Sequence, residues 1–264
     1  MLTHPNFDPV AISIGPISIH WYGLMYLVGF SAAWFLATRR AKLDQYPVTR
    51  AQVDDLIFYS ALGVVLGGRF GYVFFYNFDK FLLEPLWLFK VWEGGMSFHG
   101  GLLGVITAMF IYAKRINITA GQLLDFVAPL VPIGLGLGRI GNFIGQELWG
   151  RPTDVAWGMV FTTDPDGLAR HPSQLYQAGL EGLLLFIIVY WFSRLPRPPW
   201  SVGGVFLAGY GCMRFFAEFF RQPDSHIGFD AFGWLTRGQL LSVPMIVIGL
   251  MLVVFAYRRQ MQSA

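Results

Sequence analysis

The sequence predicts an all-α, polytopic membrane protein with about seven transmembrane helices and a small loop region outside the membrane. Of its 264 residues, 55% are hydrophobic and only 13% are charged, and the mean hydropathy is +0.50. Such a composition is typical of chains whose helices lie in lipid. Seven apolar stretches are long enough to cross a hydrocarbon core of about 30 Å: residues 18–38, 55–77, 96–114, 121–141, 173–193, 203–221 and 238–257.

Capping boxes predict where three of these helices begin. In a capping box, a threonine and a glutamine three residues later satisfy backbone donors at a helix start. The pattern predicts the starts of the second, fourth and seventh spans at Thr49 with Gln52, Thr119 with Gln122, and Thr236 with Gln239.

Proline and glycine mark the breaks between elements. Pro129 and Pro132 interrupt the fourth apolar stretch, and the segment LPRPPW at 195–200 predicts a short stiff turn between the fifth and sixth spans. We find no linker, so residues 1–264 are expected to form a single membrane domain. The connection at about 148–172, rich in Asp, Pro, Gly and Thr, is expected to form a small element or a lid.

The distribution of basic residues predicts the orientation. The first 17 residues contain no Lys or Arg. The larger basic set falls on alternate connections and the C-terminal tail: Arg39, Arg40, Lys42, Arg50, Lys114, Arg115, Arg194, Arg197, Arg258 and Arg259. The opposite connections hold a smaller set: Lys80, Lys90, Arg151, Arg170, Arg221 and Arg237. By the positive-inside rule, the N-terminus is periplasmic and the C-terminus cytoplasmic. The first apolar run lacks a basic leader, so no cleavable signal peptide is expected.

Charged residues inside apolar helices are the strongest pointers to function. The segment GRIGNFIGQELWG at 138–150 carries Arg139, and a charge at bilayer depth costs about 2.5 to 3.5 kcal/mol. Arg139 therefore requires an anionic partner or a watery cavity. Arg69 and Arg214 also lie at membrane depth beside glycines, which either permit close helix packing or let a lipid headgroup reach the backbone.

The sixth span carries a polar face. Tyr210, Arg214 and Glu218 are spaced by four residues, so they lie on one side of a helix. Either Arg214 and Glu218 form a self-neutralising ion pair, or Glu218 orients Arg214 toward a substrate phosphate. Both interpretations can hold together.

Histidine and cysteine usage narrows the chemistry. His99 stands at the outer end of the third span and is either a structural residue or a base, because a histidine of ordinary pKa near 6.5 can accept a proton at neutral pH. Cys212 is the only cysteine, which excludes an internal disulfide. Five scattered histidines without metal-binding spacing predict no metal, and we expect no cofactor and no nucleic-acid partner.

Over nearly its full length the chain resembles the bacterial prolipoprotein diacylglyceryl transferases. The segment at 138–150 is similar to that family's signature, apart from Gly145, where the family usually has an asparagine. Six further motifs follow the family order: HWYGLMY (20–26), GGRFGYV (67–73), MSFHGG (96–101), RHPSQLYQ (170–177), GYGCMRFFAEFFRQPD (209–224) and GQLLSVPM (238–245).

The resemblance implies transfer of the diacylglyceryl group of phosphatidylglycerol to the lipobox cysteine thiol of a prolipoprotein signal peptide, at the periplasmic side of the bacterial inner membrane. It implies catalytic roles for three residues: His99, Arg214 and Tyr22. It also implies lipid binding by a larger set: Arg139, Asn142, Glu147, Gly150, Glu218, Tyr210 and His171.

Two other functions fit some of the same residues. In a phospholipid flippase or transporter, Arg69, Arg139 and Arg214 would line an anion path, although no convincing inverted repeat is visible. Alternatively, a different headgroup transferase would use the same anion site without depending on a thiol.

Overall fold

The computed structural model describes the whole chain except residues 1, 16, 224–229, 231 and 264. Asp224, the last residue of the 209–224 motif, is among these and lies outside the described residues. The α-helices are α1 Trp21–Arg40, α2 Arg50–Tyr76, α3 Phe78–Leu83, α4 Phe98–Arg115, α5 Ala120–Val127, α6 Val131–Ile144, α7 Ser173–Gln177, α8 Leu185–Phe192, α9 Ser201–Ala217 and α10 Arg237–Ser263. The short 3-10 helices are η1 Pro85–Phe89, η2 Val91–Glu93 and η3 Ala128–Leu130, and η4 Ala178–Leu184 is π-helical. The strands are β1 Leu2–Thr3, β2 Val10–Ile14, β3 Ile17–His20, β4 Met159–Val160 and β5 Ala169–Arg170.

The predicted all-α membrane architecture is confirmed. Among the described residues, five helical segments are long and apolar enough to cross a membrane: Trp21–Arg40, Arg50–Tyr76, Ala120–Ile144, Ser173–Phe192 and Arg237–Gln262. The other two predicted spans are the 18-residue α4 and the 17-residue α9. Many large apolar side chains on these helices are exposed, for example Leu183, Trp191 and Met251. Such exposed apolar surface suits contact with lipid.

Helix starts follow the predicted capping chemistry. The Thr49 side chain accepts from the Gln52 backbone N–H while the Gln52 side chain accepts from Thr49. The same reciprocal bonds begin the fourth and seventh spans, at Thr119 with Gln122 and at Thr236 with Gln239. At the fourth span the prolines produce only the 3-10 turn η3, and helical structure continues from Ala120 to Ile144.

The chain divides into two compact units. One unit contains Met1–Leu36 and Val127–Ala264, and the other contains Ala37–Phe126. The expectation of one integrated domain therefore stays a prediction.

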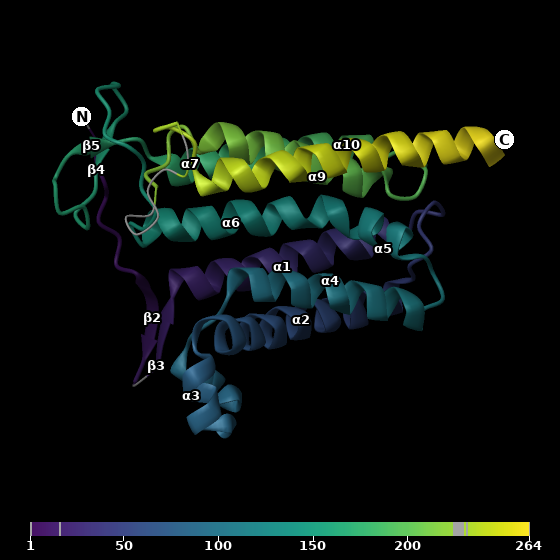
Figure 1. Cartoon of the computed structure of the whole chain (residues 1–264), viewed down its shortest axis with the longest axis horizontal. Coiled ribbons are helices and arrows are strands. Elements are labelled where there is room, and N and C mark those ends of the chain that lie inside the picture. Colours follow the sequence, from purple (N-terminus) through teal and green to yellow (C-terminus); the bar gives the residue numbers. More distant parts are fainter. Residues whose placement is uncertain (1, 16, 224–229, 231, 264) are drawn as a thin grey trace. The chain divides into compact units, whose positions relative to one another are not determined.

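In the unit Ala37–Phe126, α2 and α4 run side by side along a seam of glycines (Figure 1). Any side chain added at Gly63, Gly67 or Gly71 would collide with the backbone of Gly100 or Gly104. Small residues therefore let these two helices approach closely, as is common between helices in lipid.

Arg69 on α2 is enclosed by the segment that follows that helix. Its guanidinium donates to the carbonyl oxygens of Leu88 at 2.9 Å, Gly94 at 2.6 Å and Trp87 at 2.5 Å. It also lies 4.5 Å from the centre of the Trp87 ring, and the residue is only 2% exposed. Hydrogen bonds to backbone carbonyls satisfy this charge, so Arg69 has a structural role.

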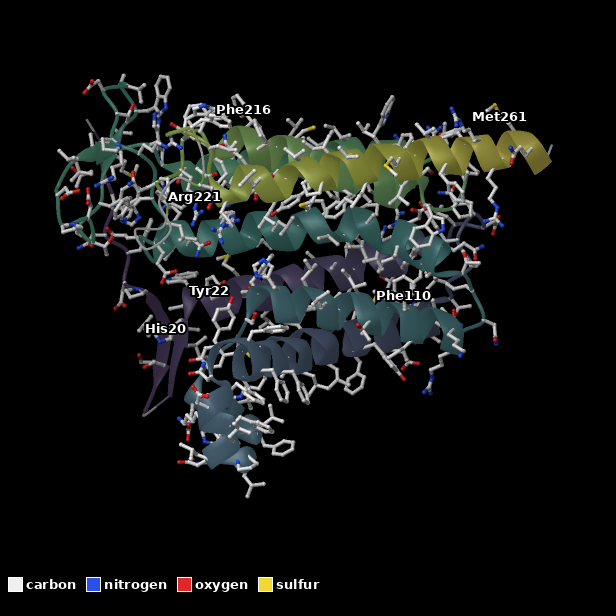
Figure 2. All side chains as sticks on the ribbon, viewed as in Figure 1. His20, Tyr22, Phe110, Phe216, Arg221 and Met261 are labelled. Carbon is white, nitrogen blue, oxygen red and sulfur yellow. The ribbon has the colours of Figure 1, made fainter. Side chains whose placement is uncertain are left out.

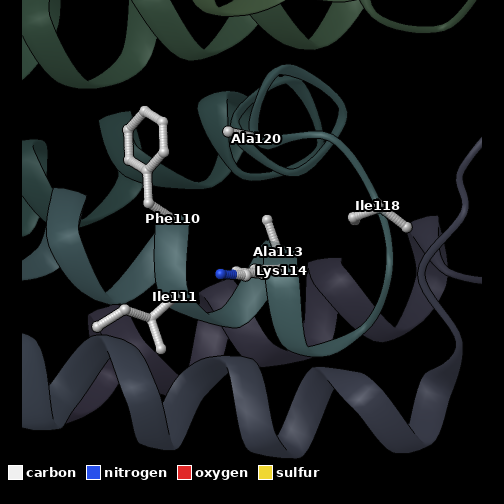
Figure 3. Close-up of a pocket in the computed structure, with 6 residues that line it drawn as sticks. All are labelled: Phe110, Ile111, Ala113, Lys114, Ile118 and Ala120. Atoms are coloured by element: carbon white, nitrogen blue, oxygen red, sulfur yellow. The ribbon is translucent and has the colours of Figure 1, made fainter.

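The same unit contains a hollow beside the end of α4 (Figure 3). Its lining is five apolar residues and one lysine: Phe110, Ile111, Ala113, Lys114, Ile118 and Ala120. This lining contains no histidine or carboxylate, and its one charged side chain is Lys114 in the last turn of α4.

In the other unit, α9 and α10 run side by side (Figure 1). Helix α6 packs on η4. The connection between residues 148 and 172 carries structure of its own, because β4 pairs antiparallel with β5 and parallel with β1. The chain's second residue is thus joined to a segment more than 150 residues away, a pairing that no local sequence pattern indicates.

Candidate functional site

Among the described residues, five charged side chains form one ion-pair network where α6, η4 and α9 meet. Glu181 on η4 lies 3.6 Å from Arg139 on α6 and 3.4 Å from Arg214 on α9. Arg214 also pairs with Glu218, which lies 3.3 Å from Arg221 just beyond α9 (Figure 2). The predicted Arg214–Glu218 pair is therefore present, as one part of a larger network.

Close helix packing positions this network. A Cβ added to Gly182 would lie 2.6 Å from the Cα of Gly136, so only glycines permit this contact between η4 and α6. Glu181 directly precedes Gly182, and Arg139 lies one helical turn after Gly136. The π-helical geometry of Ala178–Leu184 carries an extra residue per turn, a feature that is frequent at functional sites.

The two signs of charge differ in their exposure. The side chains of Glu181 and Glu218 are 0% and 1% exposed, whereas those of Arg139 and Arg214 are 20% and 14% exposed. Among the described residues, Arg139 makes a single ion pair, so most of its N–H donors remain available. Buried carboxylates thus hold two arginines whose guanidinium groups can still reach an anion.

Neutral polar side chains complete the surroundings of Arg214 and Glu218. Gln177 accepts from Arg214 at 2.9 Å, and the Thr236 hydroxyl donates to Glu218 at 2.9 Å. Tyr210 stands one turn before Arg214 and interacts electrostatically with Arg214 and Arg139. These contacts fix the direction of Arg214 and make its burial less costly.

The segment after α6 forms a tight turn with unusual backbone conformations. Gln146 and Leu148 both have positive φ, 55° and 56°, which non-glycine residues rarely adopt. Glu147 lies between them, with its carboxylate accepting from Asn142 Nδ2 at 3.3 Å and its carbonyl from Gln174 at 2.7 Å. The turn therefore holds Asn142 and Glu147 together. Their role in binding a lipid headgroup stays a prediction.

Long-range contacts hold this turn in place. The Gln146 side chain accepts from the Thr162 backbone at 2.8 Å, and Ser173 donates to the Leu148 carbonyl at 2.9 Å. His4, only 2% exposed, bonds through Nε2 to the Phe143 carbonyl at 2.9 Å. Burial lowers the pKa of His4, which keeps the imidazole neutral at pH 7.

Gly150 allows three chain segments to meet. Its N–H donates to the His171 carbonyl at 2.9 Å, and any side chain would collide with the carbonyl oxygens of His171 and Phe220. The neighbouring Arg151 donates to the backbone carbonyls of Arg221 at 3.0 Å and Glu218 at 3.2 Å. The segment after the signature is thus fastened to the end of α9, beside the ion-pair network.

His171 lies in an aromatic cluster next to Gly150. Its Nδ1 is 3.1 Å from the Tyr176 hydroxyl, which also accepts from the Trp157 indole at 2.7 Å. Burial lowers the pKa of His171, so the ring is neutral at pH 7. The His171 side chain contacts Tyr176 and Phe220, and its backbone bonds to Gly150 and Arg151.

Tyr22 and His99 stand at the beginnings of two helices. Tyr22, the second residue of α1 (Figure 2), is 45% exposed, bonds to Tyr26 at 3.2 Å and interacts electrostatically with Arg139 and Glu147. His99, the second residue of α4, is exposed and packs its ring edge-on against Phe98. Because His99 belongs to the other unit, its relation to the network stays a prediction.

Glu181 and Gln177 are functional candidates that the sequence reasoning missed. Glu181 is an isolated acid within an apolar span, a signal of the same kind as Arg139.

Among the described residues, no group of three or more His, Cys, Asp or Glu side chains is arranged to hold a metal ion.

Comparison with known proteins identifies the family. The family model described as prolipoprotein diacylglyceryl transferase matches residues 9–255. A protein of Teredinibacter turnerae named phosphatidylglycerol–prolipoprotein diacylglyceryl transferase is 62% identical over 268 residues, covering 98% of this chain and 93% of its own. Proteins of the same name from Acinetobacter baylyi and Acinetobacter baumannii are 58% and 60% identical over 263 residues, covering 98% of this chain and 96% of their own. The chain belongs to the prolipoprotein diacylglyceryl transferase family.

Proposed function

We propose that this protein transfers the diacylglyceryl group of phosphatidylglycerol to the cysteine thiol of a prolipoprotein lipobox. The observation that carries the proposal is the pair of partly exposed arginines, Arg139 and Arg214, held by buried carboxylates in the apolar helices of a member of this family. A lipid phosphodiester is an anion that reaches such a site without leaving the bilayer.

The reaction exchanges one bond to carbon for another. The thiolate sulfur attacks the glyceryl carbon that bears the phosphate ester, forming the carbon–sulfur bond of a thioether. The carbon–oxygen bond breaks, and its electron pair stays on the phosphate oxygen. A base takes the thiol proton first. This proton offsets the additional negative charge on the glycerol phosphate that is released. No oxidant, reductant or cofactor is required.

Arg139 and Arg214 bind the phosphodiester and stabilise the charge that grows on the departing phosphate. The turn containing Asn142 and Glu147 supplies hydrogen-bonding groups for the glycerol hydroxyls. Glu218 and Tyr210 orient Arg214, whereas Gly150 and His171 hold the turn against the end of α9.

His99 is the proposed base, and Tyr22 positions the thiol or relays its proton. A free thiol, with an ordinary pKa of about 8.5, needs a base or positive potential to become a nucleophile. His99→Gln is expected to lower turnover more than tenfold at pH 7 while leaving the KM for phosphatidylglycerol within threefold. A variant that keeps most of its activity would remove the assignment of His99.

The proposed location is the bacterial inner membrane, with the N-terminus in the periplasm and the C-terminus in the cytoplasm. The basic residues at the C-terminal ends of α1 and α4 support this orientation: Arg39, Arg40, Lys114 and Arg115. The reacting groups then face the periplasmic side, where the lipobox cysteine of an inserted signal peptide lies.

The flippase alternative requires Arg69, Arg139 and Arg214 to line an anion path, and Arg69 does not meet this requirement. Arg69 is enclosed by backbone carbonyls and Trp87 and is only 2% exposed, so it does not line an anion path. A headgroup transferase of another kind would use the same anion site, but its turnover would not depend on a peptide thiol.

One assay separates these functions. Purified protein in detergent receives phosphatidylglycerol and either a lipobox peptide or its Cys→Ser counterpart, and glycerol phosphate release is followed. We expect release with the thiol peptide alone. Equal release with both peptides would favour another headgroup transferase. Lipid movement between liposome leaflets without release would favour the flippase.

A further inference from the structure

Glu181 touches both arginines that the proposed function assigns to the lipid phosphate. Its Oε1 lies 3.4 Å from Arg214 Nη1, and its Oε2 lies 3.6 Å from Arg139 Nη2. The side chain is fully buried, and within the described part of the chain Oε2 accepts no hydrogen bond. A buried carboxylate with a free acceptor oxygen is costly, so its position between two arginines calls for a reason.

The formal charge of the network matches a singly charged ligand. Within the described part of the chain, Arg139, Arg214 and Arg221 contribute three positive charges and Glu181 and Glu218 two negative charges, which leaves +1. A phosphodiester carries one negative charge and would neutralise the network.

The other phosphate species in the reaction carries more charge. Glycerol phosphate is a phosphomonoester, and such a group carries about −1.5 to −2 charges at pH 7 because its second pKa is about 6. After the reaction, the network therefore faces an additional negative charge that it does not balance. Among the described residues, Glu181 is the carboxylate that contacts both arginines, so its charge repels the additional negative charge from either side of the site.

We propose that Glu181 is a specificity-determining residue that sets the site for monoanionic phosphodiesters and against phosphomonoesters, including the released product. The proposal rests on the proposed function, because the bound lipid phosphate is placed between Arg139 and Arg214. Glu181 acts through the two arginines as a positioning residue and does not itself react.

Glu181→Gln removes the charge while keeping the size of the side chain. A dianion responds to the lost charge about twice as strongly as a monoanion, on a logarithmic scale. We therefore expect the inhibition constant of glycerol phosphate to fall at least tenfold relative to the KM for phosphatidylglycerol. Turnover falls as well, because the product leaves more slowly. Phosphatidic acid, a lipid phosphomonoester, becomes a stronger competitor of the lipid substrate.

Gln177→Glu is the matched variant of opposite sign. Gln177 accepts from Arg214 at 2.9 Å, so a carboxylate there adds a negative charge beside the same arginine. We expect glycerol phosphate to bind at least tenfold more weakly to this variant. The prediction can thus be tested even where Glu181→Gln does not fold.

The test combines calorimetric binding of glycerol phosphate and inorganic phosphate with the peptide-dependent release assay, for the parent chain and both variants. Tighter binding to Glu181→Gln and weaker binding to Gln177→Glu is the expected result. Unchanged or weaker binding to a folded Glu181→Gln protein overturns the proposal, since Glu181 would then only hold the arginines in place. A parent chain that binds phosphate but shows no thiol-dependent release would instead refute the transferase function, so the two failures are distinguishable.

Discussion

Arg69 and Arg139 share the local sequence Gly-Arg-x-Gly within apolar helices, yet their surroundings are opposite. Arg69 donates to three backbone carbonyls within 2.9 Å and is 2% exposed. The Arg139 side chain is 20% exposed and meets one carboxylate at 3.6 Å. A charge at membrane depth can therefore be enclosed for stability or left open for a ligand, and the sequence motif alone does not distinguish the two.

Arg170, in the loop region, belongs with Arg69 to the class of enclosed arginines, whose guanidinium groups are fully bonded within the protein. Its guanidinium bonds to both oxygens of Asp164, at 2.5 and 2.9 Å, and to Asp166 at 2.8 Å. It also lies 4.0 Å from the centre of the Trp149 ring. Arg214 belongs to the open class, although its contacts with Gln177, Glu181 and Glu218 are more numerous than those of Arg139.

The largest expected effect on activity comes from Arg214→Gln. This change removes a phosphate ligand and also leaves Glu181 and Glu218 with less positive charge nearby. We expect a loss of more than 100-fold in kcat/KM for phosphatidylglycerol, measured by glycerol phosphate release. Arg214→Lys keeps the charge but loses the forked geometry, and should recover only part of the activity. Full activity in Arg214→Gln would place this arginine in the enclosed class.

Asp164→Asn tests the enclosed class through stability. Breaking a buried pair costs about 3 kcal/mol, so we expect a lower free energy of unfolding with nearly normal activity in the molecules that remain folded. The matched control is Asp166→Asn, because the Asp166 side chain is largely exposed and should cost little. A large activity loss without destabilisation would contradict the assignment.

The same pair predicts a dependence on pH. Its bonds to Arg170 lower the pKa of Asp164 in the folded protein. The stabilisation is therefore present above about pH 4, the pKa of an unfolded aspartate, and is lost as the pH falls toward the folded pKa. Thermal unfolding at decreasing pH should show the parent chain losing this increment while Asp164→Asn, which lacks it, changes less.

Gly145→Asn is expected to have the smallest effect. Gly145 has φ −75°, an ordinary conformation, and an added Cβ would make only van der Waals contacts at 3.5 to 3.7 Å with Gly141 and Glu147. Activity should stay within threefold of the parent chain, with Gly145→Ala as the control. A tenfold gain limited to the asparagine variant would show that its side chain takes part in the site.

The sequence predicts the helices well and the site only in part. Apolar length and capping boxes locate the spans to within a few residues, because both signals are local. The spacing of Tyr210, Arg214 and Glu218 likewise predicts their shared face. By contrast, the contacts of Glu181 with Arg139 and of β1 with β4 join segments far apart in the chain, and no short pattern encodes them.

The burial of Arg69 likewise could not be predicted from the local sequence. Its partners are backbone carbonyls, which every residue type possesses, so the sequence carries no sign of them. The positive φ at Gln146 and Leu148 is equally hidden, since neither residue type favours that conformation. Both features arise from tertiary contacts rather than local preference.

The most direct test compares Arg69→Ala with Arg139→Ala in the same preparation, measuring the midpoint of thermal unfolding and the rate of thiol-dependent glycerol phosphate release per folded molecule. We predict that Arg69→Ala unfolds at a clearly lower temperature but retains activity within a few fold, because it loses several buried hydrogen bonds. Arg139→Ala should lose at least 100-fold in activity per folded molecule and lower the unfolding midpoint less than Arg69→Ala does, because Glu181 keeps Arg214 as a partner. An Arg139→Ala protein that is unstable yet active, or an Arg69→Ala protein that is stable yet inactive, would contradict the division into enclosed and open arginines.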